Sequence, residues 1–281
     1  MARLDTSDHD RYADGMTYVY PVVSRRARGV SVGINLSPND ACNWRCVYCQ
    51  VPGLTRGKGP TIDLERLDDE LTVMLDDLID GDFMQRRVPD GSRRLNDLAF
   101  SGNGEPTGSA DFPAAVELAA AQLERRGLIG EVKLVLITNG SLAHKPEVGA
   151  ALARLAEAGG EVWFKLDAGT DAGLAAINDT TRGIDAQLGG LRAAAERCPT
   201  WLQTVLFERD GKVMAGEWRE WLANLAVLCA EELPLRGVHL YGVAREVHQP
   251  EASELVRLAP EVLEAHARQV RALGLEVTVN P

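Results

Sequence analysis

The apolar run Leu134-Val135-Leu136-Ile137, which leads into Thr138-Asn139-Gly140, decides the fold class of this chain. Consecutive side chains of a strand point to opposite faces, and all four of these side chains are apolar, so both faces of such a strand must be buried. Burial on both faces is typical of a parallel sheet that helices cover on each side. The run therefore predicts an α/β fold, with a polar loop at the carboxyl end of the strand.

The same strand pattern recurs along the chain and alternates with helical patterns. The strand candidates are Val30–Leu36, Leu95–Ser101, Val132–Asn139, Glu161–Asp167, Trp201–Phe207, Gly237–Val243 and a weaker seventh, Leu275–Val279. The helical patterns lie near Asp63–Asp80, Asp111–Arg126, Lys145–Ala158, Asp185–Arg197, Gly216–Glu232 and Pro260–Leu273. Strand-helix-strand units repeated in this way predict a partial (β/α)6 TIM-like barrel of parallel strands with outer helices.

Length and composition fit one domain. The chain has 281 residues, of which 45% are hydrophobic and 25% charged, as in ordinary globular proteins. We expect residues 1–28 to be an N-terminal extension too short to fold alone, and residues 29–281 to form a single core domain. Within it, the barrel should cover about 29–243, and 244–281 should add a short helix and strand. The sequence lacks a membrane-length apolar run, and its first residues are polar and acidic, so we expect a cytoplasmic protein without membrane contact.

The net charge of -11 is unevenly distributed. Residues 1–60 carry eight Lys or Arg against five Asp, so the remainder is strongly acidic. An acidic body argues against broad nucleic-acid binding, because phosphate contacts need Lys and Arg in number. A local basic group could still bind a phosphate or carboxylate, or simply form a solvated loop. Its members are Arg25, Arg26, Arg28, Arg56 and Lys58.

Three of the five cysteines lie in one short segment, Cys42-Asn43-Trp44-Arg45-Cys46-Val47-Tyr48-Cys49. Three thiolates on one loop can hold three corners of a [4Fe-4S] cluster and leave the fourth iron open to a ligand that is not protein. A zinc site would need a fourth ligand, for which His144, His239 or His248 is available. The spacing favours iron-sulfur ligation, with zinc as the alternative. The expected metal ligands are Cys42, Cys46 and Cys49.

Glycines and polar residues follow directly on the predicted strands. The carboxyl ends of barrel strands meet at one mouth, so these residues should converge on the cysteine loop. They are Asn35, Ser101-Gly102-Asn103-Gly104-Glu105, Thr138-Asn139-Gly140, Lys165-Leu166-Asp167, Gln203-Thr204 and Tyr241-Gly242. Alternation places Lys165 and Asp167 on one side, where a buried lysine needs either an ion pair or a bound carboxylate. Only one of Gln203 and Thr204 can face inward.

The Cys-x3-Cys-x2-Cys loop, with the aromatic Tyr48 before its last cysteine, resembles the signature of the radical S-adenosylmethionine (radical SAM) enzymes. Gly102-Asn103-Gly104-Glu105-Pro106 is similar to the Gly-Gly-Glu-Pro segment of that superfamily. The strand-helix alternation from about 29 to 243 carries the resemblance over most of the chain. Within the superfamily, Asn35–Cys42 and Gly102–Thr107 are closest to the branch of wyosine-type tRNA-base enzymes and uncharacterised iron-sulfur oxidoreductases.

The resemblance implies an enzyme that uses a [4Fe-4S] cluster and S-adenosylmethionine. A flavodoxin- or ferredoxin-like donor would reduce the cluster, and a 5′-deoxyadenosyl radical would take hydrogen from the substrate. The implied cofactor-binding residues are Tyr48, Gly102, Asn103, Gly104, Glu105, Asn139, Lys165, Asp167 and Gln203. The catalytic candidates are Lys165, Asp167 and Tyr241. Glu105 could instead be a structural acceptor at its turn, and Asn139-Gly140 could be a simple turn.

The substrate is the main open point. The sequence has no second cysteine group for an auxiliary cluster, so a small substrate, or one presented by a partner, is expected. A tRNA or other nucleic-acid base is the alternative within the same chemistry. A non-catalytic iron-sulfur or zinc-binding module is the alternative of another class.

Overall fold

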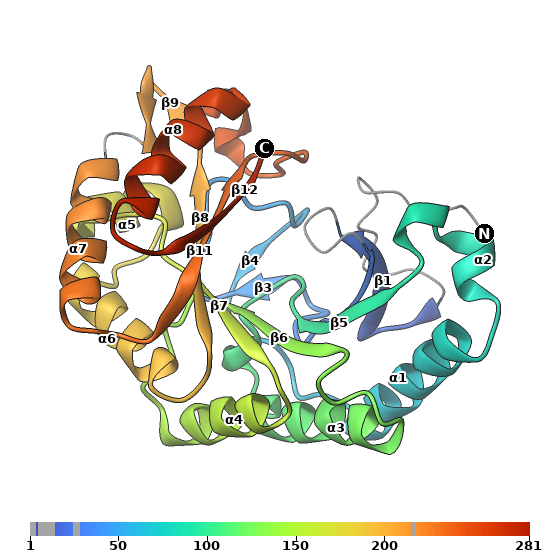
Figure 1. The fold of residues 1–281 in the computed structure, drawn as a ribbon. Coiled ribbons are helices and arrows are strands. Elements are labelled where there is room, and N and C mark those ends of the chain that lie inside the picture. Colours follow the sequence, from blue (N-terminus) through green and yellow to red (C-terminus); the bar gives the residue numbers. More distant parts are fainter. Residues whose placement is uncertain (1–3, 5–14, 25–28, 215–216) are drawn as a thin grey trace.

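The computed structural model describes residue 4 and residues 15–24, 29–214 and 217–281 (Figure 1). Its centre is an eight-stranded sheet in the order β1-β2-β5-β6-β7-β8-β11-β12. The bounds are β1 Val19–Ser24, β2 Gly29–Ile34, β5 Leu95–Phe100, β6 Lys133–Thr138, β7 Glu161–Lys165, β8 Thr200–Leu206, β11 Leu235–Gly242 and β12 Glu276–Asn280. Only the β1–β2 pair of this sheet is antiparallel. The sheet curls into a partial barrel with helices outside it, which confirms the predicted fold class.

The helices agree with the sequence periodicity within a few residues. The long ones are α1 Leu64–Ile79, α3 Phe112–Arg125, α4 Pro146–Glu157, α6 Ile184–Ala195, α7 Trp218–Ala230 and α8 Pro260–Arg271. Shorter elements are α2 Phe83–Arg87, α5 Asp171–Asn178, the 3-10 turns η2 Asp90–Ser92, η3 Pro106–Gly108 and η5 Pro250–Glu254, and the two-residue strands β3 Ala41–Cys42, β4 Thr55–Arg56, β9 Glu208–Arg209 and β10 Lys212–Val213. Among the described helices, none is long and apolar enough to span a membrane.

Strand β1 lies in the segment expected to precede the first strand. It pairs with β2 over its whole length, and its Tyr20 ring packs where a side chain on Gly33 would otherwise stand. The carboxylate of Glu70 on α1 accepts the backbone N–H groups of residues 17, 18 and 19 at 2.8, 2.7 and 3.2 Å. Pro21 argues against a strand in the sequence, because a proline is tolerated only in edge strands. β1 is an edge strand of the sheet. The division into an extension and a core domain remains a prediction.

Candidate active site

A cavity of about 460 Å³ opens on the concave side of the sheet, at the carboxyl ends of its parallel strands. Alternate residues of the strands form its wall, including Tyr20 and Val22 on β1, Asp97 and Ala99 on β5, and Trp163 and Lys165 on β7. The residues between them are buried in the core beneath the helices, as alternation requires. The structure brings together these predicted site residues at the cavity: Cys42, Cys46, Tyr48, Cys49, Gly102, Asn103, Gly104, Glu105, Asn139, Lys165, Gln203 and Tyr241.

The three thiols face this one cavity from a single loop. Burial raises the pKa of Cys42 to about 11 and that of Cys46 to about 12, so a bound metal would have to displace these protons. Within the described ranges, His, Cys, Asp and Glu side chains form no group of three around a point that could hold one metal ion. A zinc ion needs all its ligands around one point, whereas each cysteine thiolate of a [4Fe-4S] cluster binds a different iron. Three thiols on one loop suit three corners of a [4Fe-4S] cluster, whereas a zinc ion would need a fourth ligand from elsewhere.

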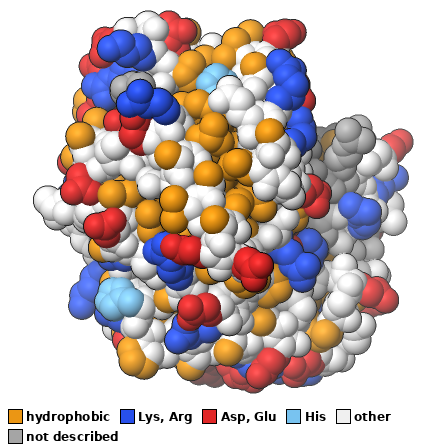
Figure 2. All heavy atoms as spheres, turned by 60° about the vertical axis from the view of Figure 1, so that its left-hand side comes forward, with side chains coloured by type: hydrophobic (Ala, Val, Ile, Leu, Met, Phe, Trp, Pro, Cys, Tyr) orange, Lys and Arg blue, Asp and Glu red, His pale blue; other side chains and the backbone are white. Residues whose placement is uncertain are grey.

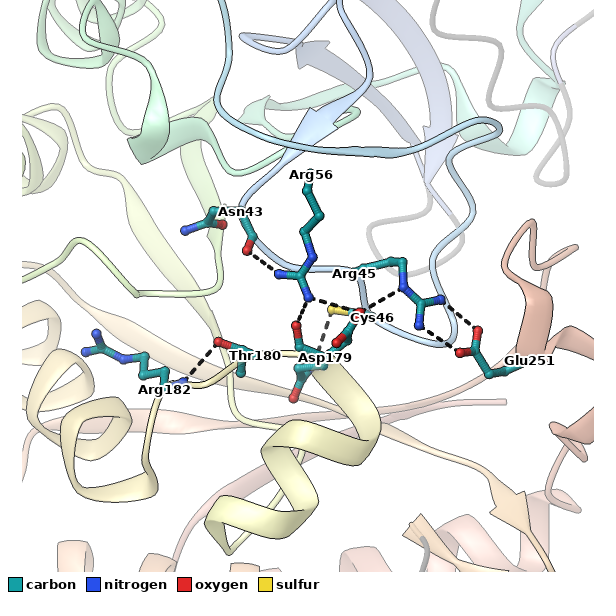
Figure 3. A network of polar contacts seen from close by, with 9 residues as sticks. Asn43, Arg45, Cys46, Arg56, Asp179, Thr180, Arg182 and Glu251 are labelled. Atoms are coloured by element: carbon teal, nitrogen blue, oxygen red, sulfur yellow. Dashed lines mark hydrogen bonds and ion pairs between the residues drawn. The ribbon is translucent and has the colours of Figure 1, made fainter.

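The C-terminal end of α5 holds one side of the cysteine loop (Figure 3). The carbonyl oxygens of Ile177 and Asn178, among the last of the helix, accept the N–H groups of Val47 at 2.9 Å and Arg45 at 3.3 Å. Such carbonyls have no partner within their own helix, so the loop satisfies them. The side-chain amide of Asn178 also lies 3.2 Å from Cys46 Sγ. The helix end and the loop are thus one hydrogen-bonded unit.

Two arginines, Arg45 of the loop and Arg56 of β4, reinforce this attachment (Figure 3). Arg45 forms an ion pair with Asp179 at 2.8 Å and a two-bond pair with Glu251 of η5 at 2.8 and 2.9 Å. Arg56 pairs with the same Asp179 at 2.9 Å and donates to the carbonyl of Asn43 at 2.8 Å. Partial burial opposes the charge of Asp179, but the two arginines outweigh it and hold the pKa of Asp179 below its usual range. These contacts join the loop to two segments distant in sequence, at Asp179 and at Glu251.

The segment Gly102–Glu105 supports the loop from the other side. A side chain on Gly104 would stand 2.1 Å from the carbonyl oxygen of Ala41, next to Cys42, and one on Gly102 would stand 2.4 Å from Asn35 Oδ1. Gly102 also has a φ of 139°, which other residues rarely adopt. Both glycines are therefore required by close packing against the segment that leads into the cysteine loop.

Glu105 lies at the centre of a buried turn. Its Oε1 accepts from the Thr107 N–H at 3.2 Å, from the Thr107 hydroxyl at 2.6 Å and from the Thr138 hydroxyl at 2.5 Å, and its Oε2 accepts from the Asn139 N–H at 2.6 Å. Burial raises the pKa of Glu105, although these hydrogen bonds act in the opposite direction. The side chain therefore joins η3 to the end of β6, which matches the structural role that sequence analysis left open.

Asn139 takes part in a turn and also faces the site, the two roles that the sequence left open. Its Oδ1 accepts the N–H of Ser141 at 3.0 Å, which is an Asx turn, and its Nδ2 donates to Asn43 Oδ1 at 2.8 Å. Asn43 in turn donates to the Ser141 hydroxyl at 2.8 Å. The turn after β6 thus contacts the cysteine loop while Asn139 lines the cavity.

Lys165 and Asp167 both lie next to Tyr48, but of the two only Lys165 lines the cavity. β7 ends at Lys165, so strand alternation does not extend to Asp167, which is buried. The Asp167 carboxylate accepts from the Tyr48 hydroxyl, from Asn178 Nδ2 at 2.8 Å and from the Val205 N–H at 3.2 Å. Among the ion pairs of the described residues none joins Asp167 to Lys165, although the charge of Asp167 helps to raise the pKa of that lysine. Asp167 therefore positions Tyr48 and the end of α5.

Lys165 instead faces the cavity, with its Nζ 5.2 Å from the centre of the Tyr48 ring. Burial opposes its charge, but the nearby groups Tyr241, Cys46 and Asp167 outweigh burial and hold the pKa of Lys165 above its usual range. A protonated lysine in such a wall suits a carboxylate ligand.

The two polar neighbours on β8 separate as alternation predicts. Gln203 lines the cavity, whereas the Thr204 hydroxyl donates to the carbonyl of Leu166 at 2.8 Å on the other face. His239 stacks on Trp201 with ring centres 4.5 Å apart, and its Nδ1 lies 2.7 Å from the Thr278 hydroxyl. His239 is thus a packed core residue.

Sequence reasoning missed several residues of this region. Ser31 and Asp97 form a hydrogen bond within the cavity wall, and Tyr20 reaches the wall from β1. The partners of Arg45 could not be found from the sequence, because Asp179 and Glu251 lie far from it along the chain. The basic residues Arg25, Arg26 and Arg28 lie outside the described residues.

Comparisons with known proteins place this site in a family. The model of the radical SAM superfamily matches residues 36–222. Two Helicobacter pylori proteins, each named UPF0026 protein, are 32% identical over 133 residues, which is 47% of this chain and 37% of theirs. The GTPase Obg of Brachyspira hyodysenteriae is 27% identical over 132 residues, 47% of this chain and 17% of that protein. The matched region thus spans well under half of these relatives.

Solved structures with the same fold are more distant in sequence. TYW1 with a lysine-pyruvate adduct has a TM-score of 0.53 at 13% identity, covering 88% of this chain and 73% of its own. AnSMEcpe with bound AdoMet has a TM-score of 0.52 at 15% identity, and the match covers 89% of this chain and 63% of that protein. The hydrogenase maturase HydG of Carboxydothermus hydrogenoformans has a TM-score of 0.54 at 12% identity, and the match covers 88% of this chain and 52% of that protein. Because the family model spans most of the chain, this chain belongs to the radical SAM superfamily, whose members use a [4Fe-4S] cluster and S-adenosylmethionine.

Proposed function

We propose that this enzyme abstracts a hydrogen atom from a small substrate bound in the cavity beside the cysteine loop. The observation that carries the proposal is that Cys42, Cys46 and Cys49 line the same cavity as Lys165 and Tyr241. When bound, the cluster supplies the electron that cleaves S-adenosylmethionine to methionine and the 5′-deoxyadenosyl radical. A flavodoxin- or ferredoxin-like protein is the proposed electron donor.

Some residues of the cavity wall would bind the cluster or S-adenosylmethionine directly, and others would position those residues. The three thiols would hold the cluster. Lys165, charged and half-buried, would bind a carboxylate, and the backbone of 102–105 with the amides of Asn139 and Gln203 would bind the polar groups of S-adenosylmethionine. Tyr241 offers a phenol as a proton donor. Asp167 would act through the Tyr48 hydroxyl rather than by touching the cofactor.

Cavity size supports a small substrate. A volume of about 460 Å³ lies in the lower part of the range of roughly 300–1,000 Å³ found for small-molecule sites. The same space must also contain S-adenosylmethionine. Little room remains, so the substrate is either small or a single group presented by a larger partner.

The test is anaerobic reconstitution with iron and sulfide, reduction, addition of S-adenosylmethionine and measurement of 5′-deoxyadenosine. We expect product from the unaltered chain and none from Cys46→Ala. Cys198→Ala is the matched control, because Cys198 is buried away from the cavity and should leave product formation unchanged. A fully loaded cluster with no product in the presence of a broad set of small substrates would contradict the proposal.

A nucleic-acid base remains the second candidate, from the resemblance to wyosine-type enzymes. Arg56, one of its basic residues, is engaged by Asn43 and Asp179. Figure 2 shows basic and acidic side chains interspersed on the face that it displays, rather than gathered by sign. Strongly salt-dependent tRNA binding would favour this candidate, and absent or salt-insensitive binding would exclude it. The third candidate, a non-catalytic iron-sulfur or zinc-binding module, fails if the protein cleaves S-adenosylmethionine.

A further inference from the structure

Asn178 is a buried polar residue that the proposed reaction does not yet use. It is the last residue of α5 and is fully buried. Its Nδ2 atom lies 2.8 Å from Asp167 Oδ2 and 3.2 Å from Cys46 Sγ. One side-chain amide thus contacts both the carboxylate that holds Tyr48 and one of the three thiols of the loop.

The chemistry of Asp167 fixes which atom of Asn178 faces the sulfur. The Asp167 carboxylate already accepts from the Tyr48 hydroxyl and the Val205 N–H, so it serves as an acceptor. The Asn178 atom beside it must therefore be the NH₂ group. That group has two hydrogens, one for the carboxylate and one for Cys46 Sγ. A flipped amide would place an oxygen against the carboxylate, which is repulsive.

Several contacts fix this amide in place. The neighbouring backbone of α5 accepts the N–H groups of Arg45 and Val47, on both sides of Cys46. The next residue, Asp179, pairs with Arg45 and Arg56. The donor is therefore positioned by the same helix end that holds the loop, and it is shielded from water by burial.

We propose that Asn178 is a positioning and tuning residue that donates a hydrogen bond to the Cys46 sulfur and raises the reduction potential of the cluster. The inference rests on the proposed ligand role of Cys46. Hydrogen bonds to ligand sulfurs are among the factors that set the potential of an iron-sulfur cluster. They stabilise the negative charge added on reduction, so removal of this donor makes reduction harder.

The test is a redox titration of the reconstituted cluster, followed by electron paramagnetic resonance, in the unaltered chain and in Asn178→Leu. Leucine keeps the approximate size of the side chain and lacks the donor. At the midpoint potential of the unaltered protein, we expect the reduced-to-oxidised ratio of the variant to fall about tenfold, which corresponds to about 59 mV for one electron. Asn224→Leu is the matched control, because Asn224 donates a side-chain hydrogen bond to the Gly169 carbonyl elsewhere and should leave the potential unchanged.

The outcomes separate this inference from the proposed function. A more negative potential in Asn178→Leu alone supports the inference. An unchanged potential with a fully assembled cluster overturns it and leaves the proposed function standing. If Asn178→Leu does not fold, Asn178→Ala, which also lacks the donor but has a smaller side chain, gives the same readout. Failure of the unaltered chain to assemble any cluster overturns the proposed function and this inference together.

Discussion

At the scale of single residues, Gly104 shows how close packing shapes the site. A side chain there would stand 2.1 Å from the Ala41 carbonyl and 2.5 Å from the Ser37 hydroxyl. We expect Gly104→Ala to cost about 1–3 kcal/mol of the free energy of unfolding, as overpacking usually does, and to displace the segment leading into Cys42. Iron and sulfide bound per chain should fall. Gly108→Ala, which meets nothing within 4 Å, should change neither quantity, and equal losses in both variants would contradict this account.

Glu105 gives a residue-scale prediction about pH. Burial raises its pKa in the folded protein above the usual 4.5, so the folded state holds the proton more tightly than the unfolded state. The contribution of this group to stability is therefore greatest at low pH and falls as the pH rises from 4.5 through the folded pKa. Glu105→Gln cannot titrate, so the stability difference between the unaltered chain and this variant should shrink across that window.

Denaturant unfolding at several pH values measures this difference. Glu147→Gln, which removes a carboxylate from the exposed first turn of α4, is the control for a general charge effect. A difference that grows as the pH rises would show that the hydrogen bonds from Thr107, Thr138 and Asn139 dominate over burial. The same result would argue for a Glu105 that is charged and fixed at neutral pH.

At the scale of elements, sequence patterns predicted the long helices and most strands of the sheet but missed the short helix α5. The six long helices and seven of the strands follow from periodicity, because each buries an apolar face over many residues. Helix α5 is only eight residues long and was not predicted, yet its end holds the cysteine loop through Asn178 and Asp179. Such contacts join residues more than a hundred positions apart, and no local pattern encodes them.

The 3-10 turn η5 provides the element-scale prediction. Its Glu251 receives two hydrogen bonds from Arg45, which lower the pKa of Glu251. The pair therefore stabilises the folded protein above the usual glutamate pKa of 4.5, and this stabilisation is lost as the pH falls through the lowered pKa. We expect Glu251→Gln to loosen the loop and to speed the loss of cluster iron to a chelator at neutral pH. Glu254→Gln in the same turn breaks a pair with Arg209 instead and should retain iron normally. Equal rates in both variants would rule out a role for the Arg45 pair.

At the scale of the whole molecule, the sequence predicted the partial barrel and the place of its site, because strand ends in a parallel sheet must meet at one edge. It did not predict how the sheet ends. β1 is antiparallel, contains Pro21 and owes its position to Glu70 on a distant helix. The wall that β1 adds to the cavity, through Tyr20 and Val22, was therefore also missed.

The role of Glu70 can be tested on the stability of the entire fold. Glu70→Ala leaves the N–H groups of residues 17–19 without their carboxylate, and buried donors without partners cost roughly 1–3 kcal/mol each. Because β1 is continuous with the eight-stranded sheet, we expect the loss to lower the midpoint of one cooperative unfolding transition. Glu65→Ala, on the exposed face of the same helix, should leave that midpoint nearly unchanged. A separate early transition in Glu70→Ala would instead mean that β1 detaches while the rest of the sheet remains folded, and that the cavity can lose this wall without losing the barrel.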